Sequence, residues 1–112
     1  MIYLDAVVSY IATSYGFSAA ELRGRARTAR VSRARQLAVA ALIELDATLV
    51  EVGQILGKRD HTTIMYLRDQ AAQVVARDEL AAQVVAAAVR RAREAIAAGH
   101  AAAAIHLAST EQ

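Results

Sequence analysis

The sequence predicts an all-α fold, a helix-turn-helix bundle of about six helices with an extended C-terminal helix. Its 112 residues contain no proline and are rich in alanine, leucine and arginine, which favour helix over strand. Apolar residues recur at intervals of three and four along most of the chain. Glycines and short polar residues interrupt this pattern where helices are expected to begin and end. The length suits a single domain with one core.

The first half of the chain predicts three helices. Residues 2–15 carry an apolar stripe, and Gly16 after them suits a helix C-terminus. Ser18 and Glu21 form a capping-box pattern that begins a short second helix. Residues 25–30 lack apolar periodicity and are expected to form an exposed basic loop. A third helix is expected from residue 31 or 32 to residue 45, with a buried face made by Leu37, Ala38, Ala41, Leu42 and Leu45.

Residues 48–67 predict the two helices of a helix-turn-helix. Thr48 and Glu51 form a second capping box, beginning a helix that closes at Gly57. Two basic residues complete the turn, and Asp60 is expected to cap the second helix. In this motif the second helix places its N-terminal residues against base edges in the major groove, while the first helix braces against the DNA backbone.

The C-terminal third predicts a long helix that packs on the same domain. Asp78 and Glu79 suit its N-terminus, and Gly99 is expected to end or kink it. We therefore divide the chain into a helix-turn-helix region, residues 1–77, and a C-terminal helical extension, residues 78–112. The extension could also support a homodimer. Its apolar side is expected to consist of Leu80, Val84, Ala88, Val89, Ala92 and Ile96.

Positive charge is concentrated in the middle of the chain. Residues 21–68 hold nine Lys/Arg and five Asp/Glu, whereas residues 1–20 and residues 69–112 each have a balance of −1. Six arginines lie between residues 23 and 35 with no acidic residue among them. Such a concentration is typical of a surface that binds a polyanion.

The residues that begin the second helix of the motif have side chains that can read bases. Asp60 can accept a hydrogen bond from a cytosine amino group, and His61 can donate to or accept from a purine edge. Thr62 offers a hydroxyl group and a methyl group. The alternative is that Asp60 only caps the helix and that Thr62 and Thr63 are surface residues. Spacing alone leaves both interpretations open.

Two segments resemble a known family. Residues 57–67, GKRDHTTIMYL, are similar to the signature of the C-terminal DNA-binding domain of the bacterial replication initiator DnaA, whose pattern is close to G-G-R-D-H-S/T-T-V. Residues 31–38, VSRARQLA, resemble the family's V-A/S-R-P-R-Q-I/M-A segment. The resemblance covers about residues 4–77 and implies that the partner is double-stranded DNA.

The resemblance also implies a role for individual residues. Asp60, His61 and Thr62 would contact bases in the major groove, and Thr63 would contact the backbone or adjoining bases. Arg27 would enter the adjacent minor groove, where a narrow groove concentrates negative potential. Contacts with the DNA backbone are expected from Arg25, Arg35, Gln36, Lys58 and Arg59.

The chain departs from the family pattern at several positions. Lys58 replaces a usual glycine, Ala34 replaces a common proline, and the loop at residues 46–47 is one residue shorter than usual. Val50 stands where a proline that touches bases often lies, and Ile43 stands where a basic residue is common. DNA binding is still expected, but the standard initiator-box preference does not follow.

Other classes of function have little support in the sequence. Full-length initiators carry an ATPase domain before this one, which is not expected here. Residues 53–58 do not form a phosphate loop, because only three residues separate the glycines and Arg59 replaces Ser/Thr. We expect no nucleotide, cofactor, metal or catalytic residue. With no signal sequence and no apolar segment long enough to span a bilayer, a cytoplasmic, nucleoid-associated protein is expected.

Two hypotheses about function remain. The first is a stand-alone, sequence-specific regulator of transcription or replication initiation that binds double-stranded DNA without ATPase activity. The alternative is a helical protein-interaction module that has kept the DNA-binding shape but acts on a protein partner. The arginines at residues 25–35 favour the first, because the cores of protein interfaces are depleted in charge.

Overall fold

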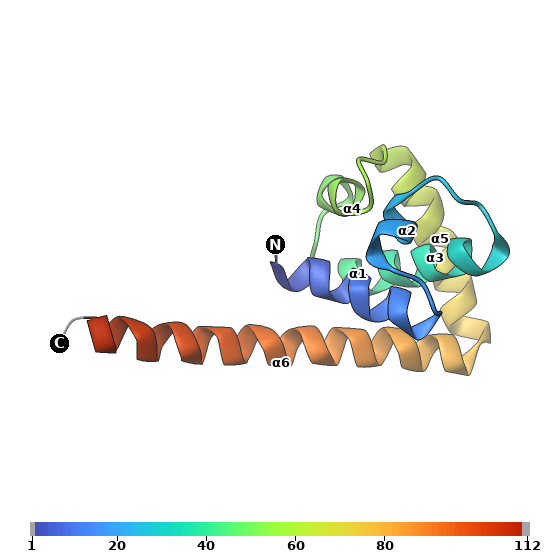
Figure 1. Cartoon of the computed structure of the whole chain (residues 1–112). Helices are drawn as coiled ribbons and strands as arrows, with labels where there is room; N and C mark the ends of the chain where they lie inside the picture. Colours follow the sequence, from blue (N-terminus) through green and yellow to red (C-terminus); the bar gives the residue numbers. More distant parts are fainter. Residues whose placement is uncertain (1, 111–112) are drawn as a thin grey trace.

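The computed structural model describes residues 2–110, and the side chains of residues 4–99. The described chain folds into six α-helices without a strand, which confirms the predicted all-α class (Figure 1). The helices are α1 (Ile2–Ser14), α2 (Ala19–Arg23), α3 (Ala29–Glu44), α4 (Leu49–Ile55), α5 (His61–Arg77) and α6 (Glu79–Thr110). None of them, within the described residues, is long and apolar enough to cross a membrane.

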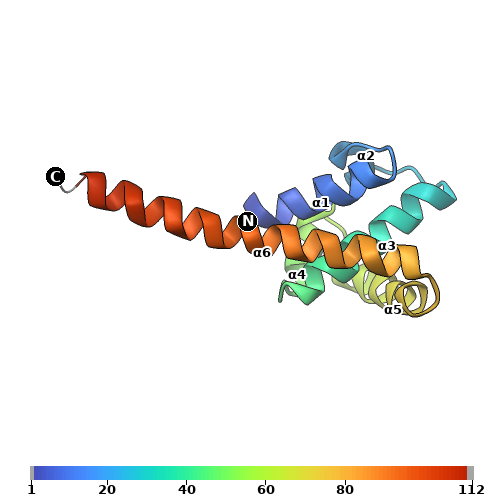
Figure 2. The same ribbon diagram turned by 90° about the horizontal axis from the view of Figure 1, so that it is seen from below.

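Helix α3 lies at the centre of the bundle and contacts all five other helices. Its side chains Leu37 and Leu42 are fully buried, and burying a leucine stabilises a fold by roughly 1.5–3 kcal/mol. On one side α3 packs against α1 and against α6, which crosses it at an angle (Figure 2). On the other it supports α5 through contacts that include the buried Ile64. Packing against the bundle core therefore fixes the position of α5.

Hydrogen bonds at the N-caps determine where the helices begin, and α3 begins earlier than predicted. The capping boxes of Ser18 with Glu21 and of Thr48 with Glu51 are both formed, as predicted. Helix α3, however, begins at Ala29 rather than at residue 31 or 32, because the Thr28 hydroxyl accepts a hydrogen bond from the Val31 amide at 3.3 Å. The basic loop that connects α2 to α3 is thus confined to residues 24–28.

Helix α6 crosses the base of the bundle and extends beyond it (Figure 1). Two predictions about it are corrected in part. The helix does not end at Gly99, since a single glycine costs only about 1 kcal/mol in an otherwise alanine-rich helix. Ala88, Val89 and Ala92 are buried as predicted, but Leu80 is 73% exposed, because the buried face begins with Ala81 and Val85 instead. Small side chains on that face let α6 lie close to α1 and α3.

Candidate nucleic-acid interface

The turn between α4 and α5 is tight and requires glycine at Gly57, in the turn, and at Gly53, in α4. Gly57 has φ +84°, and a Cβ atom there would lie 2.3 Å from the carbonyl oxygen of Arg23. A Cβ on Gly53 would lie 2.2 Å from the carbonyl oxygen of Arg59. Lys58 also has a left-handed backbone, with φ 61°, a conformation that costs a non-glycine residue roughly 1–2 kcal/mol. The turn therefore packs directly on α4 and on the end of α2.

The N-terminus of α5 projects polar side chains into solvent. Asp60 is the N-cap residue, as predicted, but its side chain makes no hydrogen bond to the helix. Its Oδ1 atom lies 3.1 Å from Nδ1 of His61, and the two side chains are 69% and 58% exposed. Thr62 and Thr63 are exposed as well, with Ile64 buried beneath them. The first backbone amides of α5 are left without a side-chain cap, which suits an anionic ligand.

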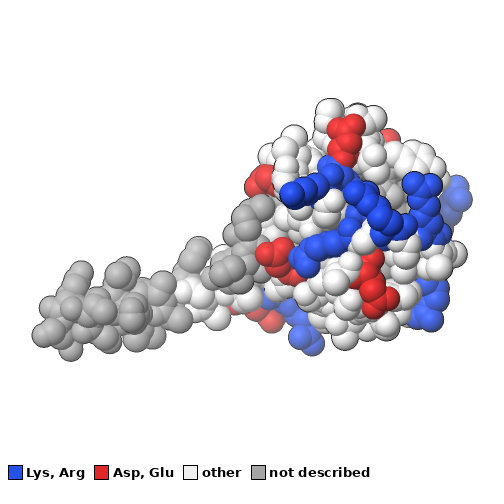
Figure 3. Space-filling view, turned by 45° about the horizontal axis from the view of Figure 1, so that its top comes forward, with Lys and Arg blue, Asp and Glu red and all other residues white. Residues whose placement is uncertain are grey.

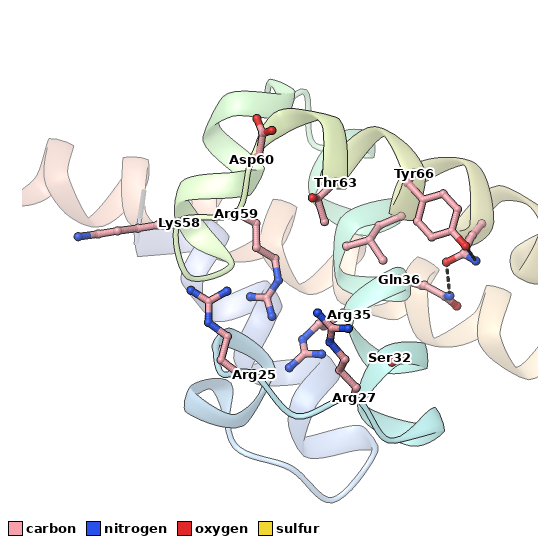
Figure 4. Close-up of a pocket in the computed structure, with 12 residues that line it drawn as sticks. Arg25, Arg27, Ser32, Arg35, Gln36, Lys58, Arg59, Asp60, Thr63 and Tyr66 are labelled. Carbon is pink, nitrogen blue, oxygen red and sulfur yellow. Dashed lines mark hydrogen bonds between the residues drawn. The ribbon is translucent and has the colours of Figure 1, made fainter.

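The basic loop faces the N-terminus of α5 across a groove of about 560 Å³ (Figure 4). Arg25 and Arg27 of the loop are exposed and line one wall of this groove. Asp60 and Thr63 line the opposite wall. The structure thus brings to one groove eight of the ten residues singled out from the sequence: Arg25, Arg27, Arg35, Gln36, Lys58, Arg59, Asp60 and Thr63. The other two, His61 and Thr62, lie outside its lining.

Arg35, expected from the resemblance to contact the DNA backbone, is buried and is bonded to the protein's own backbone. Only 5% of this residue is exposed. Its guanidinium donates to the carbonyl oxygens of Leu22 at 2.7 Å, of Gly24 at 2.8 Å and of Glu21 at 3.3 Å, and also to that of Ala26. Arg35 therefore ties α3 to the C-terminus of α2 and to the basic loop.

Arg59 makes an equivalent set of contacts from the helix-turn-helix side. Its guanidinium donates to the carbonyl oxygens of Gly24 at 2.6 Å and of Arg23 at 3.2 Å, and to that of Leu56. Arg23 in turn donates through Nε to the carbonyl of Ile55 at 3.0 Å. These hydrogen bonds hold the turn and the basic loop together, and the Gly24 carbonyl accepts from both Arg35 and the half-buried Arg59.

The buried Arg35 and the half-buried Arg59 form a cationic cluster with the loop. Burial lowers the pKa of Arg35, and the charges of Arg59, Arg25 and Arg27 lower it further. Burial also lowers the pKa of Arg59, with Arg25 adding to the effect. Within the described side chains, no carboxylate pairs with either guanidinium. The groove thus concentrates positive charge that the protein itself does not neutralise.

A chain of polar side chains borders the same groove, and of its members the sequence singled out only Gln36. The amide of Gln36 donates to Gln70 at 2.9 Å, and the amide of Gln70 donates to the Tyr66 hydroxyl at 2.8 Å. Tyr66, Leu67 and Gln70 from α5, with Ser32 from α3, complete the lining. The sequence does carry a signal for the residues of α5. Residues 66, 67 and 70 follow Thr63 by three, four and seven positions, so on a helix that begins at residue 61 they lie on the same face as Thr63.

Lysine and arginine side chains form a nearly continuous band across this face of the molecule (Figure 3). The band includes the exposed loop arginines and Lys58. A tight helix-turn-helix, an uncapped second helix and an adjoining basic groove define a helix-turn-helix domain of the DNA-binding class.

Comparison with known sequences agrees with this class. The profile of the family described as "Bacterial dnaA protein helix-turn-helix" matches residues 4–70, and the chain belongs to this family. The chain is similar to proteins named chromosomal replication initiator protein DnaA. With that of Roseiflexus castenholzii it is 38% identical over 84 residues, 74% of this chain and 18% of the relative.

Two further relatives carry the same name. The identity is 32% over 82 residues with the protein of a Picosynechococcus species, covering 72% of this chain and 18% of the relative. It is 41% over 61 residues with that of Thermus thermophilus, covering 54% and 14%. The chain therefore spans less than a fifth of the length of these relatives, and the similarity concerns their helix-turn-helix domain.

Proposed function

We propose that this protein binds double-stranded DNA sequence-specifically by reading two adjacent grooves. The N-terminus of α5 enters the major groove, where Asp60, His61 and Thr62 contact bases and Thr63 contacts a base or the adjoining backbone. Arg27 enters the neighbouring minor groove. The observation that carries the proposal is the placement of the basic loop and the α5 N-terminus on opposite walls of one groove.

The exposure of these side chains supports the division of roles. His61 and Thr62 stand outside the groove lining, at the tip of the helix that would penetrate furthest into DNA. Arg25 and Lys58 are exposed cations beside it and are suited to phosphate contacts, as is the outer amide proton of Gln36. Arg35 and Arg59 have a different role in this proposal. They fix the loop and the turn relative to each other, and their positive charges lie at the floor of the groove.

Dimethyl sulfate protection tests the proposal, because the reagent distinguishes contacts in the major groove from contacts in the minor groove. Dimethyl sulfate methylates guanine N7 in the major groove and adenine N3 in the minor groove. On a duplex selected from a random library, His61→Ala is expected to lose protection of guanine N7, and Arg27→Ala to lose protection of adenine N3. Each good base contact is worth roughly 1–3 kcal/mol, so each variant should bind about 5- to 100-fold more weakly. Loss of neither protection would contradict the proposed orientation.

Binding as a function of salt addresses the alternative, a protein-interaction module. A protein that neutralises several phosphates loses affinity steeply as salt increases, because counterions are released from DNA. Arg25→Ala should reduce the slope of log K against log salt by about 1. A flat response, or no binding to duplexes of any sequence, would rule out the DNA proposal.

We further propose that the protein acts as a regulator of replication or transcription initiation by occupying sites of the initiator type, without ATP hydrolysis. The names of its relatives support the process, and the departures at Val50 and Lys58 predict a changed sequence preference. Affinity for DNA should not change when ATP is added. The duplexes recovered from the random library would show whether an initiator-type site is preferred.

The C-terminal extension is the remaining part of the proposal. We divide the chain at residues 77 and 78 and assign self-association to α6, the distal part of which extends past the other helices (Figure 1). Sedimentation velocity across a concentration range tests this assignment. A monomer at all concentrations up to the millimolar range would contradict it.

A further inference from the structure

We propose that the groove between the basic loop and α5 is a seat for one DNA strand, in which the Tyr66 hydroxyl donates a hydrogen bond to a phosphodiester oxygen. This inference rests on the proposed two-groove binding. It goes further by assigning a DNA contact to Tyr66, supported by Ser32.

The geometry of the two-groove arrangement requires such a seat. In duplex DNA a sugar–phosphate strand separates each major groove from the neighbouring minor groove. If α5 enters one groove and Arg27 the other, the strand between them must lie in the space that separates α5 from the basic loop. That space is the groove of about 560 Å³ (Figure 4). The side chains that border it away from the bases are those of Ser32, Gln36 and Tyr66.

The hydrogen bonds within the protein leave the Tyr66 proton available. The hydroxyl oxygen of Tyr66 accepts from Gln70, whose own oxygen accepts from Gln36. The chain of donors thus runs from Gln36 through Gln70 to Tyr66, and it ends on a hydroxyl proton with no acceptor among the described side chains. Hydrogen bonds in such a chain polarise one another, which makes the last donor stronger. Tyr66 is 62% exposed, so a phosphate can reach it.

Ser32 provides a second neutral donor on the opposite wall. It lies in the first turn of α3 and lines the groove, and its hydroxyl forms no hydrogen bond within the described part of the chain. Its position depends on the Thr28 cap, which starts α3 early enough to bring this turn to the groove. Two neutral donors, one on each wall, suit a phosphodiester oxygen between them.

The charges around the groove favour an anion at this place. Arg35 and Arg59 lie in its floor and donate to carbonyl oxygens; burial lowers the pKa of Arg35, and repulsion from the charge of Arg59 lowers it further. A phosphodiester above them would relieve this repulsion without any exchange of hydrogen bonds. Most N–H donors of the two guanidinium groups already bond to carbonyl oxygens, four on Arg35 and three on Arg59, so we assign the further hydrogen bonds to the strand to the hydroxyl groups of Tyr66 and Ser32.

The test compares Tyr66→Phe with Tyr10→Phe on the duplex selected for the unmodified protein. Tyr10 lies beneath Arg91, whose guanidinium carbon is 4.8 Å from the ring centre, and it does not line the groove. Both changes remove one hydroxyl group and keep the ring. Because Tyr66→Phe removes a hydrogen bond to a charged group, it should weaken binding about tenfold. Tyr10→Phe should leave the affinity unchanged. The salt slope and the preferred sequence should stay unchanged, because the phenol is neutral and phosphates carry no sequence information.

A second measurement identifies the phosphate. Neutral methylphosphonate linkages are placed singly along the duplex, and affinity is measured for the unmodified protein and for Tyr66→Phe. At one position the tenfold difference between the two proteins should disappear. If Tyr66→Phe binds the natural duplex as tightly as the unmodified protein, or if no position removes the difference, the seat is wrong while two-groove binding stands. If the unmodified protein binds no duplex, both proposals fail.

Discussion

Replacing Arg35 by methionine should destabilise the fold rather than only weaken DNA binding. Methionine keeps much of the volume but removes every donor of the buried guanidinium. Of the four carbonyl oxygens that accept from it, those of Leu22 and Gly24 lie at 2.7 and 2.8 Å. At roughly 1.5–3 kcal/mol for each charge-assisted bond, these two alone correspond to about 3–6 kcal/mol. Arg35→Lys should recover part of this, because lysine lacks the fork that reaches several carbonyls.

The measurement is urea unfolding followed by circular dichroism, with Arg25→Met as the matched control. Arg25 is an exposed arginine of the basic loop, so its replacement should change the free energy of unfolding by less than about 0.5 kcal/mol. For Arg35→Met a loss of about 3–6 kcal/mol would be a large share of the roughly 5–15 kcal/mol typical of domains. If Arg35→Met unfolds like the unmodified protein and lowers only the salt slope of DNA binding, Arg35 is a phosphate ligand and the structural role is refuted.

Three further predictions concern the turn and its caps. Gly57→Ala should cost about 2–5 kcal/mol in thermal melts, and the control Gly16→Ala about 1–2 kcal/mol, because both have positive φ but only Gly57 abuts the Arg23 carbonyl. Lys58→Gly should stabilise the fold by about 1 kcal/mol through relief of its left-handed backbone, and should reduce the salt slope of DNA binding by about 1. The hydrogen bond from the Thr48 amide lowers the pKa of Glu51, so the stabilising effect of the Glu51 carboxylate is present above its unfolded pKa and is lost as pH falls. Glu51→Gln keeps the cap but does not titrate, so its urea midpoint should change less than that of the unmodified protein between about pH 6 and pH 3.

The features that could be predicted from sequence are those determined by neighbouring residues. The capping boxes at Ser18 and Thr48 depend only on a residue three positions later, and both form as predicted. The helix-turn-helix follows from the spacing between Thr48 and Asp60. Each capping box lies within one helical turn, and the helix-turn-helix spacing lies within twelve positions, so tertiary packing has little opportunity to override these signals.

The role of Arg35 could not be predicted in this way. In the sequence it is one of six arginines in a basic run, and such a run usually forms a solvated face. Its burial depends on carbonyl oxygens at the C-terminus of α2 and in the loop, which lack partners in their own helix and lie beside α3 only in the folded chain. The exposure of Leu80 has a similar origin, because apolar spacing fixes the period of a helix but not its rotation relative to its neighbours.

The arrangement of Arg35 and Arg59 bears on how so small a domain would span two grooves of DNA in the proposed binding mode. A five-residue loop that carried Arg25 and Arg27 freely would have to lose its conformational freedom upon binding, and that loss would reduce affinity. Here Arg35 from α3 and Arg59 from the turn both bond to the carbonyl of Gly24, at the start of the loop. The position of the loop is thereby fixed relative to α5 before DNA arrives. In the proposed binding mode, Arg35 and Arg59 thus pre-organise the loop arginines, and the distance between the loop and α5 is set by hydrogen bonds to the protein's own backbone.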